Sequence, residues 1–283
     1  MNGGAVWGIF LQTYRVTIRS KWLLIFALVF FFFAFNIPFL STSVGATIPA
    51  NNVPNFIQLV ITTSFSLMPL LSLPIGAVSI VEERESGSLS YIFSTPTSRG
   101  KFLIARALGL WGATTTIIAL GFTLATVIAF KLTPASLQMW NVVVAAAILN
   151  AVMISLSLVV STLSRKRLTA YGAAIFVWFL LTYAGDTSIS GSVLAAANQY
   201  LVLIPTIFLN PIEVSRLIAV WLLNTNAHGQ LVLATADLGS SGQALIYVFG
   251  TSGAYYALLV TMTMWMTVCL AASYFIMTFQ DIR

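Results

Sequence analysis

The chain has 283 residues, of which 59% are hydrophobic and only 7% are charged, whereas soluble domains carry roughly 25% charged residues. A water-soluble fold of this length cannot hide so much apolar surface, because a large part of any folded surface faces water. The composition therefore predicts an all-α, polytopic helical membrane protein. The formal net charge of +6 is explained by cations in membrane-flanking loops and does not indicate nucleic-acid binding.

Residues 1–21 lead into the first long apolar segment. Aromatic side chains such as Trp7 and Tyr14 alternate there with polar groups, and three cations end the stretch. This pattern predicts a helix that lies in the membrane interface, and an unstructured basic lead is the alternative. Residues 22–40 follow with an apolar core longer than the 7–15 residues of a signal peptide, so we expect an uncleaved first span.

Five further apolar segments are long enough to cross a bilayer whose hydrocarbon core is about 30 Å thick. We expect these spans at residues 56–81, 102–130, 140–163, 168–183 and 253–279. The second span contains Pro69 and Pro74, each of which removes a backbone donor and can kink a helix. Residues 22–283 are thus predicted to form a single transmembrane domain of six helices.

The cations predict how the spans are oriented. With six crossings and a cytoplasmic N-terminus, eleven of the thirteen Lys and Arg residues lie inside. These are Arg15, Arg19, Lys21, Arg84, Arg99, Lys101, Arg106, Arg165, Lys166, Arg167 and Arg283, and only Lys131 and Arg216 lie outside. Under the positive-inside rule, this bias places both termini in the cytoplasm, within a multi-pass protein of the inner (cytoplasmic) membrane.

Residues 184–252 are predicted to form an extracytoplasmic helical insertion between spans five and six. Val193–Leu209 is apolar enough for a seventh crossing, and seven crossings would leave the cations just as unequally distributed. Its marginal length, two internal amide side chains and Pro205 favour a re-entrant or interfacial helix instead. A second such helix is expected around Pro211–Leu223, and Asn224–Ser241 is polar and predicts an exposed loop.

The longest charged and turn-rich interruption of the apolar sequence lies between spans two and three, at residues 82–101. It holds three carboxylates, four cations counting Arg106 just beyond it, Gly87 and a Thr-Pro break at Pro96. An idle connection between antiparallel helices is usually much shorter. We therefore interpret this segment as a docking surface on the cytoplasmic side, and a solvated loop whose acids balance its bases is the alternative.

A docking segment needs an apolar contact and charges that fix its register. The apolar contact is expected from Leu89, Tyr91, Ile92 and Phe93. The carboxylates Glu82, Glu83 and Glu85 are placed to pair with cations of a partner, or with Arg84 and Arg99 of this chain.

The sequence holds no constellation that supports catalysis. His228 lies in a polar loop away from clustered carboxylates, and Cys269 stands alone in an apolar run. No GxxxxGK[ST] phosphate-binding loop is present, so this chain cannot itself be the ATPase of a pump. No charge lies deep in a predicted span, which weighs against a channel or a proton-coupled carrier. We therefore expect no enzymatic activity and neither a metal nor a cofactor bound by this chain.

The charged segment EERESGSLSYIFSTPTSRGKFLIARALG resembles the cytoplasmic loop of ABC-2 type transporter permeases. The matching positions are Glu82, Glu83, Gly87, Leu89, Pro96, Ser98 and Arg99. The predicted layout is also similar, with an amphipathic N-terminal helix, six spans and an outer insertion before the last. The resemblance implies that this loop is a coupling helix seated in a groove of a separate ATP-binding subunit, where ATP and Mg would bind.

Two shorter stretches are similar to NosY-type permeases of that family. The first is FLNPIEVSRLIAV, which contains Asn210, Pro211, Glu213 and Arg216, and the second is the turn LSRKRLTAYGAAIFVWF, which contains Arg165, Lys166 and Arg167. The three consecutive cations of the turn depart from the pattern and could serve membrane anchoring. The resemblance implies a part in the maturation of copper-containing nitrous oxide reductase.

Taken together, these observations predict the permease subunit of an ATP-driven transporter. Its expected partners are a second copy of this chain, ABC ATP-binding subunits, membrane lipid and an extracytoplasmic accessory protein. Export of lipid, glycan or small toxic compounds is the alternative within this class. An ATP-independent carrier or a structural membrane subunit is the alternative outside it.

Overall fold

The computed structural model describes residues 3–41, 53–89, 98–130, 134–184, 199–223 and 239–279. The helices are α1 (Gly3–Ile18), α2 (Lys21–Ser41), α3 (Val53–Glu85), α5 (Arg99–Phe130), α6 (Pro134–Leu163), α7 (Arg167–Phe179), the π-helical segment η2 (Leu180–Ala184), α9 (Gln199–Leu209), α10 (Pro211–Leu223) and α11 (Gly239–Phe279). Within these ranges there is no strand, so the all-helical prediction is confirmed for the part of the chain that is described.

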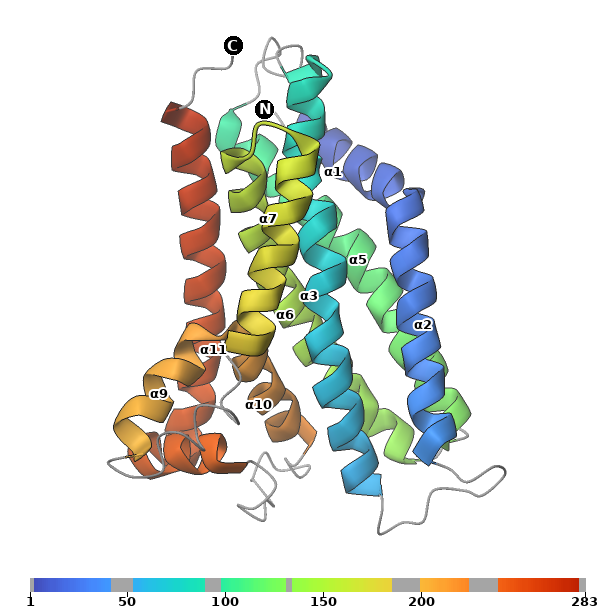
Figure 1. Ribbon diagram of the computed structural model, residues 1–283, viewed down its shortest axis with the longest axis vertical. Coiled ribbons are helices and arrows are strands. Elements are labelled where there is room, and N and C mark those ends of the chain that lie inside the picture. The colour runs from blue at the N-terminus through green and yellow to red at the C-terminus, as the bar shows by residue number, and fades with distance from the viewer. Residues whose placement is uncertain are drawn as a thin grey trace.

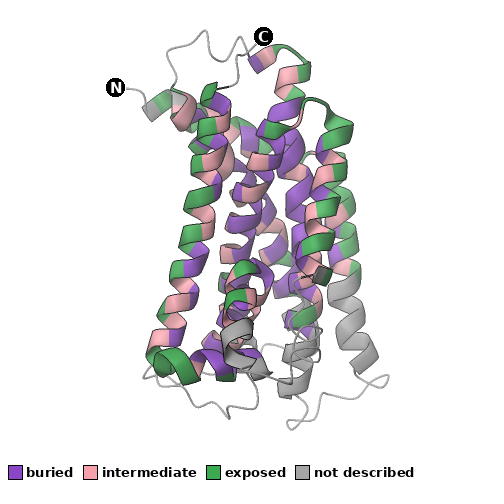
Figure 2. Ribbon diagram, turned by 60° about the vertical axis from the view of Figure 1, so that its left-hand side comes forward, coloured by how far each residue is buried: buried purple, intermediate pink, exposed green. Residues whose placement is uncertain are grey.

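Helix α6 lies at the centre of the bundle, where it packs against α3, α5, α10 and α11. Buried residues gather on the facing sides of these helices, and exposed residues lie on the outward faces (Figure 2). Many outward side chains are large and apolar, such as Leu28, which is 71% exposed, and Phe176, which is 63% exposed. A helical bundle with an apolar exterior fits a lipid solvent, in which the backbone polar groups are satisfied inside each helix.

Four described helical segments are long and apolar enough to cross a membrane: Val60–Glu85, Arg99–Leu124, Trp140–Leu163 and Ser241–Phe279. The described apolar parts of α2 and α7, Lys21–Phe32 and Arg167–Tyr183, are shorter. The molecule is therefore a multi-pass membrane protein, and the count of six spans stays a prediction.

Glycines let three pairs of helices approach closely. A Cβ built on Gly76 of α3 would lie 1.7 Å from Ser157 Oγ of α6. On α5, a Cβ at Gly121 would lie 2.2 Å from the ring of Phe30, and one at Gly109 would lie 2.7 Å from Thr13 Cβ of α1. Small residues at such contacts are the usual means by which membrane helices pack, because lipid supplies no hydrophobic drive between them.

The contact at Gly109 fixes α1 on α5. Helix α1 crosses the bundle obliquely at the end where both termini lie (Figure 1). Its outer side exposes Trp7 (59%) and Val16 (64%), whereas Thr13 and Thr17 are buried. A helix therefore lies within the range 1–21, at Gly3–Ile18, and its amphipathic, interfacial character stays a prediction.

A buried amide joins three helices in the middle of the bundle. Asn150 of α6 donates from Nδ2 to Thr114 Oγ1 at 2.7 Å and Thr115 Oγ1 at 2.8 Å, both on α5. Its Oδ1 accepts a 2.6 Å hydrogen bond from Ser72 of α3. Every polar atom of the amide is used, which is what a polar group in an apolar interior requires.

The region predicted as an insertion contains α9, α10 and the first turns of α11, which lie at the end opposite the termini (Figure 1). Helix α10 is largely buried and packs on α3, α6 and α11. The expected loop Asn224–Ser241 ends too late, because α11 already begins at Gly239. The loop was predicted to extend this far because the first residues of α11 are Gly and Ser, which are typical of loops. Span six was expected to start at Gly253. That residue lies inside α11, just after a break in the helix at Gly250, where φ is 71°.

Candidate functional site

The last turn of α3 carries four consecutive charged residues, Glu82 to Glu85, and the segment 86–98 follows it. We call the end of the bundle that holds this turn the loop end. The side chains of this turn contact α5, α6 and α7, and Arg99 at the start of α5 contacts α11. The residues predicted to dock a partner therefore also connect the helices of this chain to one another.

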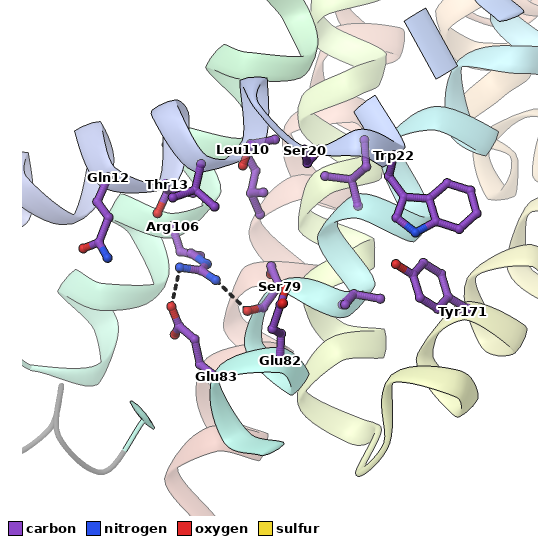
Figure 3. Close-up of a pocket in the computed structure, with 14 residues that line it drawn as sticks. Gln12, Thr13, Ser20, Trp22, Ser79, Glu82, Glu83, Arg106, Leu110 and Tyr171 are labelled. Carbon is purple, nitrogen blue, oxygen red and sulfur yellow. Dashed lines mark hydrogen bonds and ion pairs between the residues drawn. The ribbon is translucent and has the colours of Figure 1, made fainter. Parts of the chain in front are cut away.

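Glu83 ties α3 to α5. Its Oε1 lies 2.6 Å from Nη1 of Arg106, and Nη2 of Arg106 donates to the Ser79 carbonyl at 2.5 Å (Figure 3). The side chains are 16% and 15% exposed, so most of the pair is removed from water. In this setting the attraction between the two charges is screened much less than at a surface.

Arg167 ties α3 to α7. Its guanidinium lies 3.1 Å from Glu82 Oε1 and 2.8 Å from Glu85 Oε2. Its backbone N–H also donates to Glu85 Oε1 at 3.0 Å. Since Arg167 is the first residue of α7, the two carboxylates lie at a helix N-terminus, where negative charge is favoured. Each pair is partly exposed and contributes little alone, but together they position α7 against α3.

Two arginines bind the carbonyl ends of other helices. Arg84 donates to Ser164 O at 2.9 Å and to Thr162 O at 3.4 Å, at the end of α6. Arg99 donates to the Met277 carbonyl at 2.5 Å and to that of Thr278 at 3.1 Å, at the end of α11. A cation at a helix C-terminus satisfies carbonyls that have no partner within the helix and complements the helix dipole.

The pairing of the three carboxylates is the main point that sequence reasoning missed. Glu82, Glu83 and Glu85 were expected to meet a partner, or Arg84 and Arg99, yet they pair with Arg106 and Arg167. The position of Arg106 could have indicated its pairing with Glu83. Arg106 lies two turns into α5, at the same height as the end of the antiparallel helix α3. Arg84 and Arg99 instead donate to backbone carbonyls at the ends of α6 and α11.

The segment 86–98 begins with a tight turn. Gly87 has a φ of 73°, which L-residues with side chains rarely adopt, so a glycine is required there. Leu89 is 2% exposed and packs in a cluster with Ile80, Phe102 and other apolar residues. A residue expected as a contact for a partner is thus buried within this chain. Ser98 is exposed at the other end, where its Oγ accepts from Lys101 N at 3.4 Å and caps α5.

Four residues predicted as docking contacts, Tyr91, Ile92, Phe93 and Pro96, lie outside the described residues. In the turn before α7, Arg165 and Lys166 are exposed. Their predicted roles stay predictions.

The motif predicted for the outer side begins α10. Asn210 is the N-cap, since its Oδ1 accepts from Ile212 N at 3.1 Å, and Pro211 occupies the first helical position, where its missing N–H costs nothing. Asn210 Nδ2 also donates to the Leu181 carbonyl of η2 at 3.1 Å. The motif is therefore a helix start that also holds the π-helical end of the α7–η2 segment.

Arg216 joins α10 to α3. Its Nη1 lies 3.3 Å from Glu213 Oε2, and its Nη2 donates to the Thr62 carbonyl at 3.3 Å and to Ser66 Oγ. The Ser66 carbonyl also accepts from Trp178 Nε1 of α7 at 2.9 Å. A second polar cluster thus lies between α3, α7 and α10. Sequence reasoning placed Arg216 outside the membrane and missed these contacts.

A family comparison covers nearly the whole molecule, because residues 7–282 match the model of the ABC-2 family transporter proteins. The chain belongs to this family. Two curated relatives are similar along most of their length. A probable ABC transporter permease protein NosY of Pseudomonas aeruginosa is 26% identical over 249 residues, which cover 85% of this chain and 90% of that protein. A protein of the same name from Stutzerimonas stutzeri is 26% identical over 221 residues, covering 75% and 80%.

This ABC-2 chain is therefore a transmembrane transporter subunit. Its family implies a separate ABC ATP-binding partner. Among the described residues, no group of three or more His, Cys, Asp or Glu side chains is arranged to hold a metal ion. The contacts described at the loop end are ion pairs and helix caps, which position helices.

Proposed function

We propose that this ABC-2 subunit couples ATP hydrolysis in a separate ATP-binding subunit, where ATP and Mg would bind, to the translocation of a substrate across the inner membrane. The chain itself is not expected to be an enzyme. The observation that carries the coupling is the network at the loop end. There, Glu83 contacts α5, Arg84 contacts α6, Glu85 contacts α7 and Arg99 contacts α11.

The network gives the segment 86–98 a mechanical role. A partner that closes on ATP would push this segment, and the two helices that it connects, α3 and α5, would move. The pair Glu83–Arg106 would carry the movement between them, and Arg167 would carry it to α7. The ring contact between Trp22 and Tyr171, with centroids 5.2 Å apart, extends the connection to α2. Such a concerted shift of the first, second and fifth predicted spans would open a route toward the outer side.

We also propose that the active unit is a homodimer of this chain with two ATP-binding subunits and cytoplasmic termini. One bundle is not expected to enclose a substrate route by itself, and two-fold pairing is the commonest way to complete such a route. The outward faces of α2 and α7 expose apolar side chains, including Leu28 and Phe176. Lipid and a second copy would share these faces.

The similarity to two permeases named NosY supports a narrower role, the maturation of the copper site of nitrous oxide reductase, in which an extracytoplasmic accessory protein would take part. Export of lipid, glycan or small toxic compounds is the second candidate within the class. An ATP-independent carrier or a structural subunit is the candidate outside it. Co-purification with an ATP-binding protein that has no spans of its own separates the two classes.

Topology is the first experiment. Ser98 is exposed at the loop end and Cys269 is the chain's single cysteine and is buried, so Ser98→Cys in a Cys269→Ala background gives one reactive site. A membrane-impermeant maleimide should label this site only from the cytoplasmic side. Labelling from the outside of intact cells would remove the contact with an ATPase and, with it, the proposed function.

The second experiment tests the loop as the transmission element. Ile92→Ala with Phe93→Ala should reduce both co-purification of the ATP-binding subunit and the stimulation of ATP hydrolysis by the permease. Val268→Ala is the matched control, because Val268 is an apolar side chain, 57% exposed, on α11 and away from the loop. Leu89 is left intact, since its burial would mix packing with docking. Full coupling in the double variant would show that the loop does not transmit work.

A further inference from the structure

A pocket of about 230 Å³ lies at the loop end, between α1 and the ends of α3, α5 and α7. This volume far exceeds the ~30 Å³ that a water molecule occupies in the liquid. Figure 3 shows Glu82 and Glu83 on one side, α1 with Gln12 and Thr13 on the other, and Trp22 facing Tyr171 at one edge. The pocket therefore has room for a small polar group, bounded by charged and aromatic side chains.

Three residues that line this pocket each carry a buried polar atom without a hydrogen-bond partner. Among the described residues, six buried side-chain atoms have none, and three of these are Thr13 Oγ1, Glu83 Oε2 and Arg106 Nε. All three residues line the pocket, and Thr13 is only 3% exposed. Buried polar groups are usually paired, so three such atoms beside one pocket make an acyl chain an unfavourable occupant.

The charges of the lining favour a cation. Glu83 is matched by Arg106, but Glu82 is a second carboxylate, and its described partner, Arg167, does not line the pocket. Glu82 is 56% exposed and pairs through Oε1. The aromatic rings of Trp22 and Tyr171 lie beside it and offer faces that attract cations. An ammonium group would therefore find a carboxylate and two rings, with the hydroxyls of the pocket as further acceptors.

The surroundings of the pocket point to a lipid as the source of that ammonium group. The lining residues Val16 and Trp22 are 64% and 46% exposed, and α2 continues with exposed Leu24 and Ile25. Exposed cations, namely Arg15, Arg19 and Lys21, flank this corner between α1 and α2. Aromatic and apolar side chains beside cations are typical of the level of lipid headgroups.

The first turn of α2 adds a site for an anion next to the pocket. Ser20 caps this helix, since its Oγ accepts from Leu23 N at 3.2 Å, and Lys21 is the first helical residue. N–H groups at a helix start and an adjacent lysine favour a phosphate. The corner thus offers acceptors for an amine beside donors for a phosphate, which is the charge pattern of one zwitterionic headgroup.

We propose that this pocket binds the headgroup of phosphatidylethanolamine from the adjoining leaflet. The primary ammonium group contacts Glu82 and the Trp22–Tyr171 rings, and the phosphate lies at the start of α2. The lipid thereby bridges α1, α2 and the last turn of α3.

The experiment is native mass spectrometry of the full-length chain in detergent. An equimolar mixture of phosphatidylethanolamine, phosphatidylcholine and phosphatidylglycerol with identical acyl chains is added. Phosphatidylcholine keeps the positive charge but has no N–H donors, and phosphatidylglycerol has no amine. Phosphatidylethanolamine should be retained about tenfold over each of the others, because charge-assisted hydrogen bonds to a carboxylate are lost in both. Equal retention of the three lipids would overturn the proposal.

Glu82→Gln should lower the retention of phosphatidylethanolamine to about that of phosphatidylcholine. Glu85→Gln is the matched control, because it removes one charge from the same turn and contacts the same Arg167 but does not line the pocket. An equal loss in both variants would assign the effect to the position of α7 and overturn the site. Thr13→Val tests the buried hydroxyl, and circular dichroism checks that each variant is folded. No ATP-binding subunit is present, so the result is independent of the proposed coupling.

Discussion

The ion pair Glu83–Arg106 allows a quantitative test of how the loop end holds together. Arg106 Nη1 lies 2.6 Å from Glu83 Oε1, and both side chains are about one-sixth exposed. Arg106 also donates to the Ser79 carbonyl. Replacing Arg106 with Met keeps most of the side-chain volume but leaves the Glu83 carboxylate, already with one unpaired oxygen, without its cation.

The cost of a single change follows from burial. Removing one partner of a buried pair typically costs about 3–5 kcal/mol, because the other charge stays desolvated. We expect about 3 kcal/mol for Arg106→Met, the lower end of that range, since neither side chain is fully buried. The double variant Glu83→Met with Arg106→Met leaves no unpaired charge and should lie within about 1 kcal/mol of the parent chain.

The assay is a double-mutant cycle on the purified chain. Unfolding is followed by circular dichroism during titration of mixed micelles with a denaturing detergent, for the parent, both single variants and the double variant. The sum of the two single costs should exceed the cost of the double variant by about 2 kcal/mol or more, at or above the upper part of the roughly 0.5–3 kcal/mol coupling of residues in contact. If the costs of the single variants simply add, the two side chains do not act as a pair and the reasoning on the α3–α5 connection is refuted.

Three further changes test the packing. Asn150→Leu should destabilise the bundle by about 1–3 kcal/mol, because three hydroxyl partners lose their bonds, and a loss below about 0.5 kcal/mol would contradict the role of the amide. Gly76→Ala should lower the Tm, because the new Cβ meets Ser157, and Ser157→Gly added to it should restore the Tm; no rescue would show that the close contact is not the cause. Gly109→Leu should release α1 and raise its cleavage by protease, while Gly172→Leu, where a Cβ meets nothing within 4 Å, should not.

Much of the architecture follows from the apolar pattern of the sequence. The long hydrophobic runs predicted helices, and the all-helical structure and the ABC-2 family agree with them. The start of α10 was also readable, because Asn210 and Pro211 are the residues that helix starts prefer. The start of α11 was not, since its glycines and serines have low helix propensity and are held in helical form by the packing of Ala244 and Leu245.

The pairing of charges could be predicted only in part. Sequence alone shows that Glu82, Glu83 and Glu85 lie near cations, but the choice of partner depends on the relative height of antiparallel helices. Arg106 is brought level with Glu83 by the antiparallel course of α3 and α5. The relative height of α3 and α5 cannot be predicted from apolar periodicity or loop length. A shift of one lipid-facing helix by a turn leaves the composition of its exposed face almost unchanged.

The pairing also limits how a partner can be recognised at the loop end. Glu83 and Glu85 are each paired with a cation of this chain, so a cation of the ATP-binding subunit would have to displace Arg106 or Arg167 to reach them. Displacing Arg106 from Glu83 would leave the buried guanidinium without its carboxylate. This costs more free energy than an ion pair at the surface contributes. Glu83 and Glu85 are therefore better suited to transmit force between helices than to attract the ATP-binding subunit. We propose that recognition of the ATP-binding subunit rests on the segment between Leu89 and Ser98, and the affinity for that subunit should then depend weakly on salt.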